Sequence, residues 1–185
     1  RQRQMCIRDR CGDGNLLLIL KKNKNINGRG IEINQLKVTE CLSKGLAVIE
    51  GDAEKDLINY PDNSFDFAIL NQSLQQFYNP RKVLNDLLRI ANKAIITISN
   101  FGYWKVRLHL LLKGKMPMTK TLPYNWFDTP NIHLCTCQDF EVLCQKLRVS
   151  IVEKKYVNSQ HNSNPFIKVA PNLLSAFAFY RLGKP

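Results

Sequence analysis

Short apolar runs and amphipathic segments alternate along the first half of this chain. Strand-like runs occupy residues 26–33, 46–49, 65–70 and 93–99. Helix-like segments occupy residues 15–22, 34–44 and 80–90, and residues 52–59 form a short acidic helical or turn segment. The run at 65–70 is almost continuously apolar, as in a central strand covered on both faces. This alternation predicts an α/β fold with a parallel sheet between layers of helices.

The second half departs from this rhythm. Residues 101–112 have a helical pattern, residues 114–130 are irregular and contain three prolines, and residues 138–147 form an amphipathic helix. Residues 149–156 and 174–180 are strand-like. Because these two late strands are separated by a polar loop, we expect an antiparallel hairpin at one edge of the sheet.

A glycine-rich turn opens the first helix-like segment. Glu32 follows in the next strand, eighteen residues after the last glycine of the turn. Glycines let the backbone approach a ligand, and the free N–H groups at a helix start attract an anionic group. A carboxylate at the next strand end can accept both hydroxyls of a ribose. This order predicts a nucleotide-type cofactor pocket, although Arg10 stands where a first glycine is expected. The turn consists of Cys11, Gly12, Asp13 and Gly14.

Further motifs carry a family resemblance. With the turn and Glu32, the step Gly51-Asp52-Ala53 and the run at 65–71 resemble class I S-adenosylmethionine-dependent methyltransferases. More narrowly, the chain resembles the methionine biosynthesis protein MetW family over about residues 11–155. The narrower resemblance depends on the motifs NFGYW at 100–104, GKMP at 114–117 and LPYNWFDTPNIHLCT at 122–136.

The resemblance implies a Rossmann-like methyltransferase fold: one domain over 11–185, with a mostly parallel seven-stranded sheet whose last strand is antiparallel. It implies S-adenosylmethionine as the cofactor. It also implies an accessory role beside homoserine O-acetyltransferase in methionine biosynthesis. The alternative is an active methyltransferase that acts on a small-molecule acceptor.

The resemblance also assigns contacts with the cofactor. Gly12 and Gly14 would adjoin the methionine moiety, and Glu32 would bind the ribose unless it is only a solvent-exposed strand end. Ile33 would form an apolar wall for the adenine. The remaining contacts are Cys11 and Asp13 in the turn, Asp52 at the adenine amino group, the Ala53 N–H at a ring nitrogen, and Asn71 at a strand end.

Three of these assignments have a purely structural alternative. Asp13 and Asp52 each precede a helical segment and could serve only as helix caps. Asn71 could simply cap a strand end.

The irregular segment, taken as residues 113–135, brings aromatic and rigid groups together, which favours a substrate lid or a docking surface. The alternative is a covering loop whose aromatic residues fill the core. No side chain stands out as a catalytic base, and we name no catalytic residue, because the activated methyl group of the cofactor requires mainly alignment. Cys135-Thr136-Cys137 lacks zinc-ligand spacing, so we expect no metal. The candidate partner or lid residues are Trp104, Tyr124, Trp126, Phe127 and His133.

Residues 1–10 do not fit the family pattern. Arg8, Asp9 and Arg10 stand where the family has Asp, Leu and the first Gly. Because buried arginines are costly, we expect these residues to be non-native or disordered, with the first strand missing or replaced. Binding of S-adenosylmethionine should then be weak or lost.

Composition narrows the class of partner and the compartment. The net charge is +12, but residues 1–10 hold four Arg and one Asp, or +3 of it, and the other cations are scattered, so we expect no nucleic-acid partner. No apolar run approaches the roughly 18 residues that span a bilayer, so we expect no membrane association. Six cysteines in 185 residues are too few for a disulfide scaffold, and with no signal-peptide pattern we expect a cytoplasmic protein.

Overall fold

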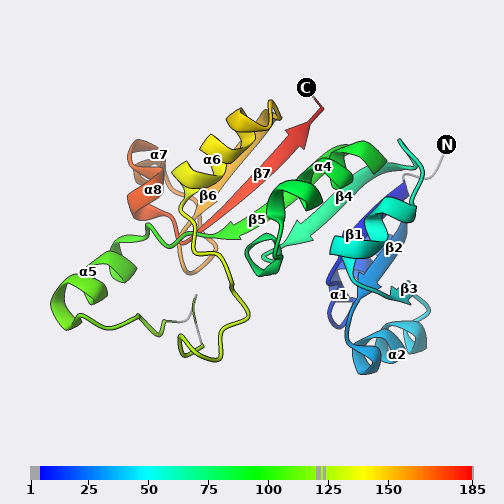
Figure 1. Ribbon diagram of the computed structural model, residues 1–185, viewed down its shortest axis with the longest axis horizontal. Helices are drawn as coiled ribbons and strands as arrows, with labels where there is room; N and C mark the ends of the chain where they lie inside the picture. The colour runs from blue at the N-terminus through cyan, green and yellow to red at the C-terminus, as the bar shows by residue number, and fades with distance from the viewer. Residues whose placement is uncertain (1–4, 120–121, 123, 185) are drawn as a thin grey trace.

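The computed structural model describes residues 5–119, 122 and 124–184 and contains a seven-stranded sheet (Figure 1). The strand order is β3-β2-β1-β4-β5-β7-β6, and β7 runs antiparallel to both of its neighbours. This order and direction confirm the predicted Rossmann-like methyltransferase fold and the hairpin at the edge. The strands are β1 (Met5–Asp9), β2 (Asn27–Glu32), β3 (Ala47–Glu50), β4 (Phe65–Asn71), β5 (Ala91–Ser99), β6 (Ser150–Val157) and β7 (Phe177–Gly183).

Helices cover both faces of the sheet. On one face, α4 and α6 pack against β1, β4, β5 and β7, and this layer forms the largest apolar core. On the other face, Leu17 of α1 and Val38 of α2 pack against Val48 of β3. The helices are α1 (Asn15–Lys24), α2 (Gln35–Ser43), α3 (Ala53–Asp56), α4 (Pro80–Ile90), α5 (Trp104–Lys113), α6 (Cys137–Lys146), α7 (Pro165–Val169) and α8 (Pro171–Leu174), with short 3₁₀ turns η1 (Leu57–Asn59) and η2 (Leu74–Gln76).

The first strand is present, so the expectation that it is missing is wrong. Met5–Asp9 forms β1, which pairs in parallel with β2 on one side and β4 on the other. Cys6 and Ile7 supply enough apolar surface to be buried, and the backbone ladder forms whatever the side chains are. Arg8 is buried with them at 7% exposure, and its Nε and Nη1 have no hydrogen-bond partner among the described residues. Burial lowers the pKa of Arg8, so the strand forms at the cost of a desolvated cation.

Two boundaries in the second half also differ from the sequence expectation. The last strand begins at Phe177 rather than at 174, because Pro171–Leu174 forms α8 with proline at its first position. The helix expected from 101 begins at Trp104. Neither α7 nor α8 was expected, because both are too short to show a helical period.

Helix α5 extends away from the sheet (Figure 1). Its base is held by a small apolar cluster in which Tyr103, Val106 and Leu122 pack with Val157 and Phe177. Among the residues that the structure describes, no helix has both the length and the apolar character needed to cross a membrane.

Candidate functional site

The glycine turn lies between the carboxyl end of β1 and the start of α1. Gly12 and Gly14 have φ of 57° and 75°, in the left-handed region that favours glycine. A Cβ on Gly14 would lie 2.5 Å from Leu46 Cδ1, whereas a Cβ on Gly12 would have nothing within 4 Å. Gly14 is therefore required by packing, and Gly12 gives the turn an open side. Gly14 is also the N-cap of α1 and provides no side-chain cap.

Glu32 ends β2 directly beside this turn. The Gly12 N–H donates to Glu32 Oε2 at 2.7 Å, and the Asn34 N–H donates to Oε1 at 3.1 Å. Glu32 is only 4% exposed, so the alternative in which it is a solvent-exposed strand end is wrong. The expected closeness of Glu32 and the turn is confirmed, while ribose binding by its carboxylate stays a prediction.

The other two turn residues have clear structural contacts. Cys11 is fully buried below the turn, where burial raises the pKa of its thiol to about 12. The neighbouring Cys41 thiol donates to the Gly12 carbonyl at 3.2 Å, which fixes the turn to α2. Asp13 is exposed, lies one residue before the N-cap Gly14, and accepts from the Asn15 N–H at the start of α1 at 3.1 Å.

The loop after β3 lies beside the end of β2. The Gly51 N–H donates to the Glu32 carbonyl at 3.0 Å, which brings Asp52 and Ala53 to the same edge of the sheet as the turn. Asp52 accepts from the Glu54 N–H at 3.1 Å and is the N-cap of α3, so the capping alternative describes its present contacts. Ala53 is buried, and its N–H, in the first turn of a helix, has no intrahelical acceptor.

Two further expected contacts lie at strand ends. Ile33 follows β2 and is 55% exposed, so a large apolar side chain is available next to Glu32. Asn71 is the exposed last residue of β4 and is in register with Thr97 of β5. Both lie at the carboxyl edge of the sheet, where open α/β sheets bind ligands.

An arginine contact that was not evident in the sequence crosses this edge. The Arg10 guanidinium donates to Gln76 Oε1 and stacks 5.1 Å from the centre of the Phe77 ring. Arg10 therefore reaches from the end of β1 to η2, which follows β4. Its φ of 44° is also in the left-handed region. Its place in the turn, where a glycine was expected, was the signal that could have identified it.

Gln75 is a second residue that the sequence did not reveal. Its side chain is buried and forms two hydrogen bonds with the backbone of Ser99. Gln75 Nε2 donates to the Ser99 carbonyl at 3.1 Å, and the Ser99 N–H donates to Gln75 Oε1 at 3.0 Å. The main-chain carbonyl of Gln75 accepts from the N–H groups of Ile132 and His133 at 2.9 and 3.0 Å. Gln75 thus fastens part of the irregular segment to the carboxyl ends of β4 and β5.

The partner or lid residues lie on the surface. Trp104, Tyr124, Trp126 and Phe127 are 40%, 51%, 73% and 66% exposed, so the alternative in which these aromatic residues fill the core is wrong. His133 is exposed too, with its ring Nε2 3.4 Å from the Tyr78 carbonyl. Trp126 and Phe127 contact each other edge to face, with ring centres 5.6 Å apart.

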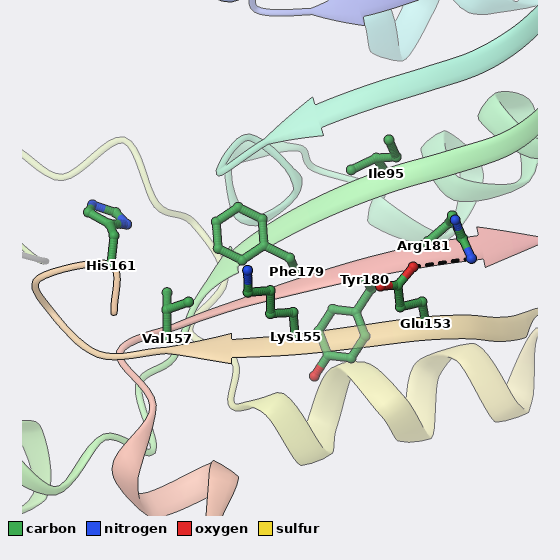
Figure 2. A pocket seen from close by; sticks show the side chains of 8 residues that line it. All are labelled: Ile95, Glu153, Lys155, Val157, His161, Phe179, Tyr180 and Arg181. Atoms are coloured by element: carbon green, nitrogen blue, oxygen red, sulfur yellow. Dashed lines mark ion pairs between the residues drawn. The ribbon is translucent and has the colours of Figure 1, made fainter. Parts of the chain in front are cut away.

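A separate hollow of about 370 Å³ lies on the β5-β7-β6 face of the sheet (Figure 2). Ile95, Val157 and Phe179 form its apolar part, and an ion pair joins Arg181 Nη2 to Glu153 Oε2 at 3.1 Å. None of the predicted site residues lines it. It is therefore distinct from the glycine turn.

Comparison with known proteins identifies the family to which this chain is similar. A family model described as methionine biosynthesis protein MetW matches residues 6–182. The bifunctional methionine biosynthesis protein MetXA/MetW of Rhodopirellula baltica is 30% identical over an alignment 183 residues long, and this alignment covers 92% of this chain. The chain spans 29% of the length of that relative.

Solved structures share the fold at low sequence identity. A SAM-dependent methyltransferase from Archaeoglobus fulgidus matches with a TM-score of 0.72 and 14% identity, over 98% of this chain and 86% of that one. A SAM-dependent methyltransferase from Thermotoga maritima, possibly a histamine N-methyltransferase, matches with a TM-score of 0.68 and 17% identity, over 100% and 84%. These likenesses show the fold, and the family match goes further: the chain belongs to the methionine biosynthesis protein MetW family.

Proposed function

We propose that this chain is an accessory protein of methionine biosynthesis that supports O-acetylation of homoserine by a separate acetyltransferase. Membership of the MetW family and the methyltransferase-like fold support an accessory role in that pathway. The observation that carries the proposal is the R. baltica relative, whose single chain bears both the MetXA and MetW names. Covalent linkage holds two modules at a high effective concentration, which is useful when they act on each other. We infer that the partner of this chain is homoserine O-acetyltransferase.

The ligand of the pocket is S-adenosylmethionine, and the described residues fit its adenosine end. Glu32 offers a buried carboxylate beside the open side of Gly12, which suits a ribose with two hydroxyls. Ile33 offers an exposed apolar surface at the same strand end. Asp52, Ala53 and Asn71 line the same edge of the sheet. When bound, the ligand supplies an activated methyl group or acts as a signal of methionine supply.

We expect this ligand to bind weakly, because two arginines disfavour its binding. Arg10 places a cation in the turn, and S-adenosylmethionine carries a positively charged sulfonium, so the two charges repel. Arg8 is buried just before the turn, and two of its nitrogens have no partner among the described residues, so the strand that leads into the turn contains a desolvated cation. The same misfit supports the proposal that residues 1–10 are not native to this fold. Sequencing of the genomic locus tests that proposal, and an intact upstream reading frame that encodes these arginines would contradict it.

We place this role in the cytoplasm. All six cysteines are free thiols, as is usual in a reducing compartment.

The test of the accessory role uses the purified chain and the cognate homoserine O-acetyltransferase. We expect the two to co-elute in gel filtration and the chain to raise the rate of homoserine acetylation, with S-adenosylmethionine present and absent as separate arms. Absence of both association and stimulation in both arms would contradict the role.

A second candidate is an active methyltransferase on a small-molecule acceptor. The specific observation in its favour is the fold shared with solved structures that are named SAM-dependent methyltransferases. No described side chain at the turn is placed as a general base, so the chain would act mainly by alignment. Transfer of a labelled methyl group from S-adenosylmethionine to small molecules of a cell extract would support this candidate.

A further inference from the structure

Helix α5 has almost no support from the other residues that the structure describes. Val106 is the one buried residue among its ten, all of which the structure describes. The helix extends from the body (Figure 1), and its base alone is packed, through Tyr103 and Val106. Most helical stability in proteins comes from packing of an apolar face, so a helix of this length needs a surface to pack against.

One face of α5 offers an unpaired apolar stripe. Trp104, Leu108, Leu111 and Leu112 stand at positions i, i+4, i+7 and i+8, which lie on the same side of a helix. Their exposed fractions are 40%, 42%, 81% and 72%. A single exposed leucine is ordinary, but a continuous stripe of this kind marks an interaction site. Helices that bind in a groove present anchors at this spacing.

The surroundings of the stripe are positively charged. Lys105, Arg107, Lys113 and Lys115 lie in or next to α5, and the sequence contains no acidic residue between Asp86 and Asp128. The occupant of this surface should therefore combine an apolar groove with carboxylates along its rim. A second copy of this chain does not have that chemistry in its own α5, because two such helices would bring like charges together.

We propose that α5 docks as a helix into an acid-rimmed apolar groove of the homoserine O-acetyltransferase. This inference rests on the proposed function, because it names the surface through which the accessory role is exerted. The relative that carries both names in one chain supports a permanent pairing of the two proteins. Permanent interfaces are more apolar than transient ones, and an exposed leucine face agrees with that.

The test measures binding of the full chain to the acetyltransferase by surface plasmon resonance. The double substitution Leu111→Asp with Leu112→Asp is expected to weaken binding on the order of a hundredfold, because central apolar anchors carry most interface energy. Both side chains are exposed, so the melting temperature should not change. Phe166→Asp with Val169→Asp, on α7 at 76% and 83% exposure, is the matched control and should bind as the wild type does.

A second pair of variants tests whether the lysines of α5 contribute to association. Lys105→Glu with Lys113→Glu should slow association and remove much of its salt dependence. Lys22→Glu with Lys24→Glu on α1 changes the net charge equally and should leave association close to that of the wild type.

Each outcome separates the inference from the function on which it rests. If the wild type binds and the leucine variants bind equally well, α5 is not the docking helix, although the accessory role stands. If the wild type fails to bind, the inference is wrong, and the accessory role is wrong as well if homoserine acetylation is also not stimulated with S-adenosylmethionine present or absent. Leucine-dependent binding to vesicles of equal phosphatidylcholine and phosphatidylglycerol, or a leucine-dependent dimer in sedimentation velocity, would also overturn the inference, in favour of a membrane or a second copy.

Discussion

The Gly12 N–H donates to the Glu32 carboxylate at 2.7 Å and joins the turn after β1 to the end of β2. The bond is charge-assisted, and it holds the two parts of the proposed ligand site in one position. Because the remaining lone pairs of the carboxylate stay available for a ribose, one residue has both a structural role and a proposed binding role.

Substitution of Glu32 tests both roles. Glu32→Gln keeps one oxygen but loses the charge, so we expect S-adenosylmethionine affinity to fall on the order of tenfold or more and stability to fall by about 1–3 kcal/mol. Titration calorimetry and urea unfolding measure the two effects. Glu50→Gln is the matched control, because Glu50 is in register with Glu32 on β3 and is exposed. Equal ligand affinity in wild type and Glu32→Gln would contradict the ribose assignment.

Gly14 should tolerate no side chain. In Gly14→Ala the new Cβ would lie 2.5 Å from Leu46 Cδ1 and 2.8 Å from Cys41 Sγ, at a φ of 75°. We expect a loss of about 2–4 kcal/mol from overpacking and backbone strain together. Gly45→Ala separates the two causes, because its φ is 68° but its Cβ would meet nothing within 4 Å. Its loss should be near 1 kcal/mol, and equal losses in the two variants would show that packing at Gly14 is unimportant.

Replacement of the buried Arg8 should stabilise the protein. Arg8→Leu removes a cation whose Nε and Nη1 have no partner among the described residues, so we expect a gain of about 1–4 kcal/mol in urea unfolding. Arg81→Leu, at an exposed position of α4, should change stability by less than about 0.5 kcal/mol. A loss of stability in Arg8→Leu would mean that the guanidinium is better satisfied than its contacts indicate.

Removal of the Arg10 side chain should strengthen ligand binding. Arg10→Gly suits the left-handed backbone there and removes a cation from the turn, so S-adenosylmethionine should bind on the order of tenfold more tightly. S-adenosylhomocysteine, which has no sulfonium charge, provides the control and should gain less. Similar gains for both ligands would point to relief of blockage by the side chain rather than of charge repulsion.

Local patterns in the sequence were enough to predict most of the fold. The apolar run at 65–70 identified the central strand β4, and Pro80 with the apolar face that follows it identified α4. The turn with Glu32 identified one edge of the sheet as the candidate site, because the order of strand, turn and helix is itself local. The first strand was misjudged because side-chain character was weighed above the backbone pairing that two neighbouring strands impose.

Contacts between distant segments could not be predicted in this way. The bond between Arg10 and Gln76 and the attachment of His133 to Gln75 join residues that are more than fifty positions apart. The sequence also could not predict whether the leucines of α5 face a core or solvent, since the same helical spacing of apolar residues occurs in both cases. The sequence by itself determined most of the order of strands and helices, the glycine turn and the family. Only the tertiary structure decided which side chains meet at the carboxyl edge and which apolar face stays exposed, because chain-distant contacts depend on sheet pairing that no local pattern encodes.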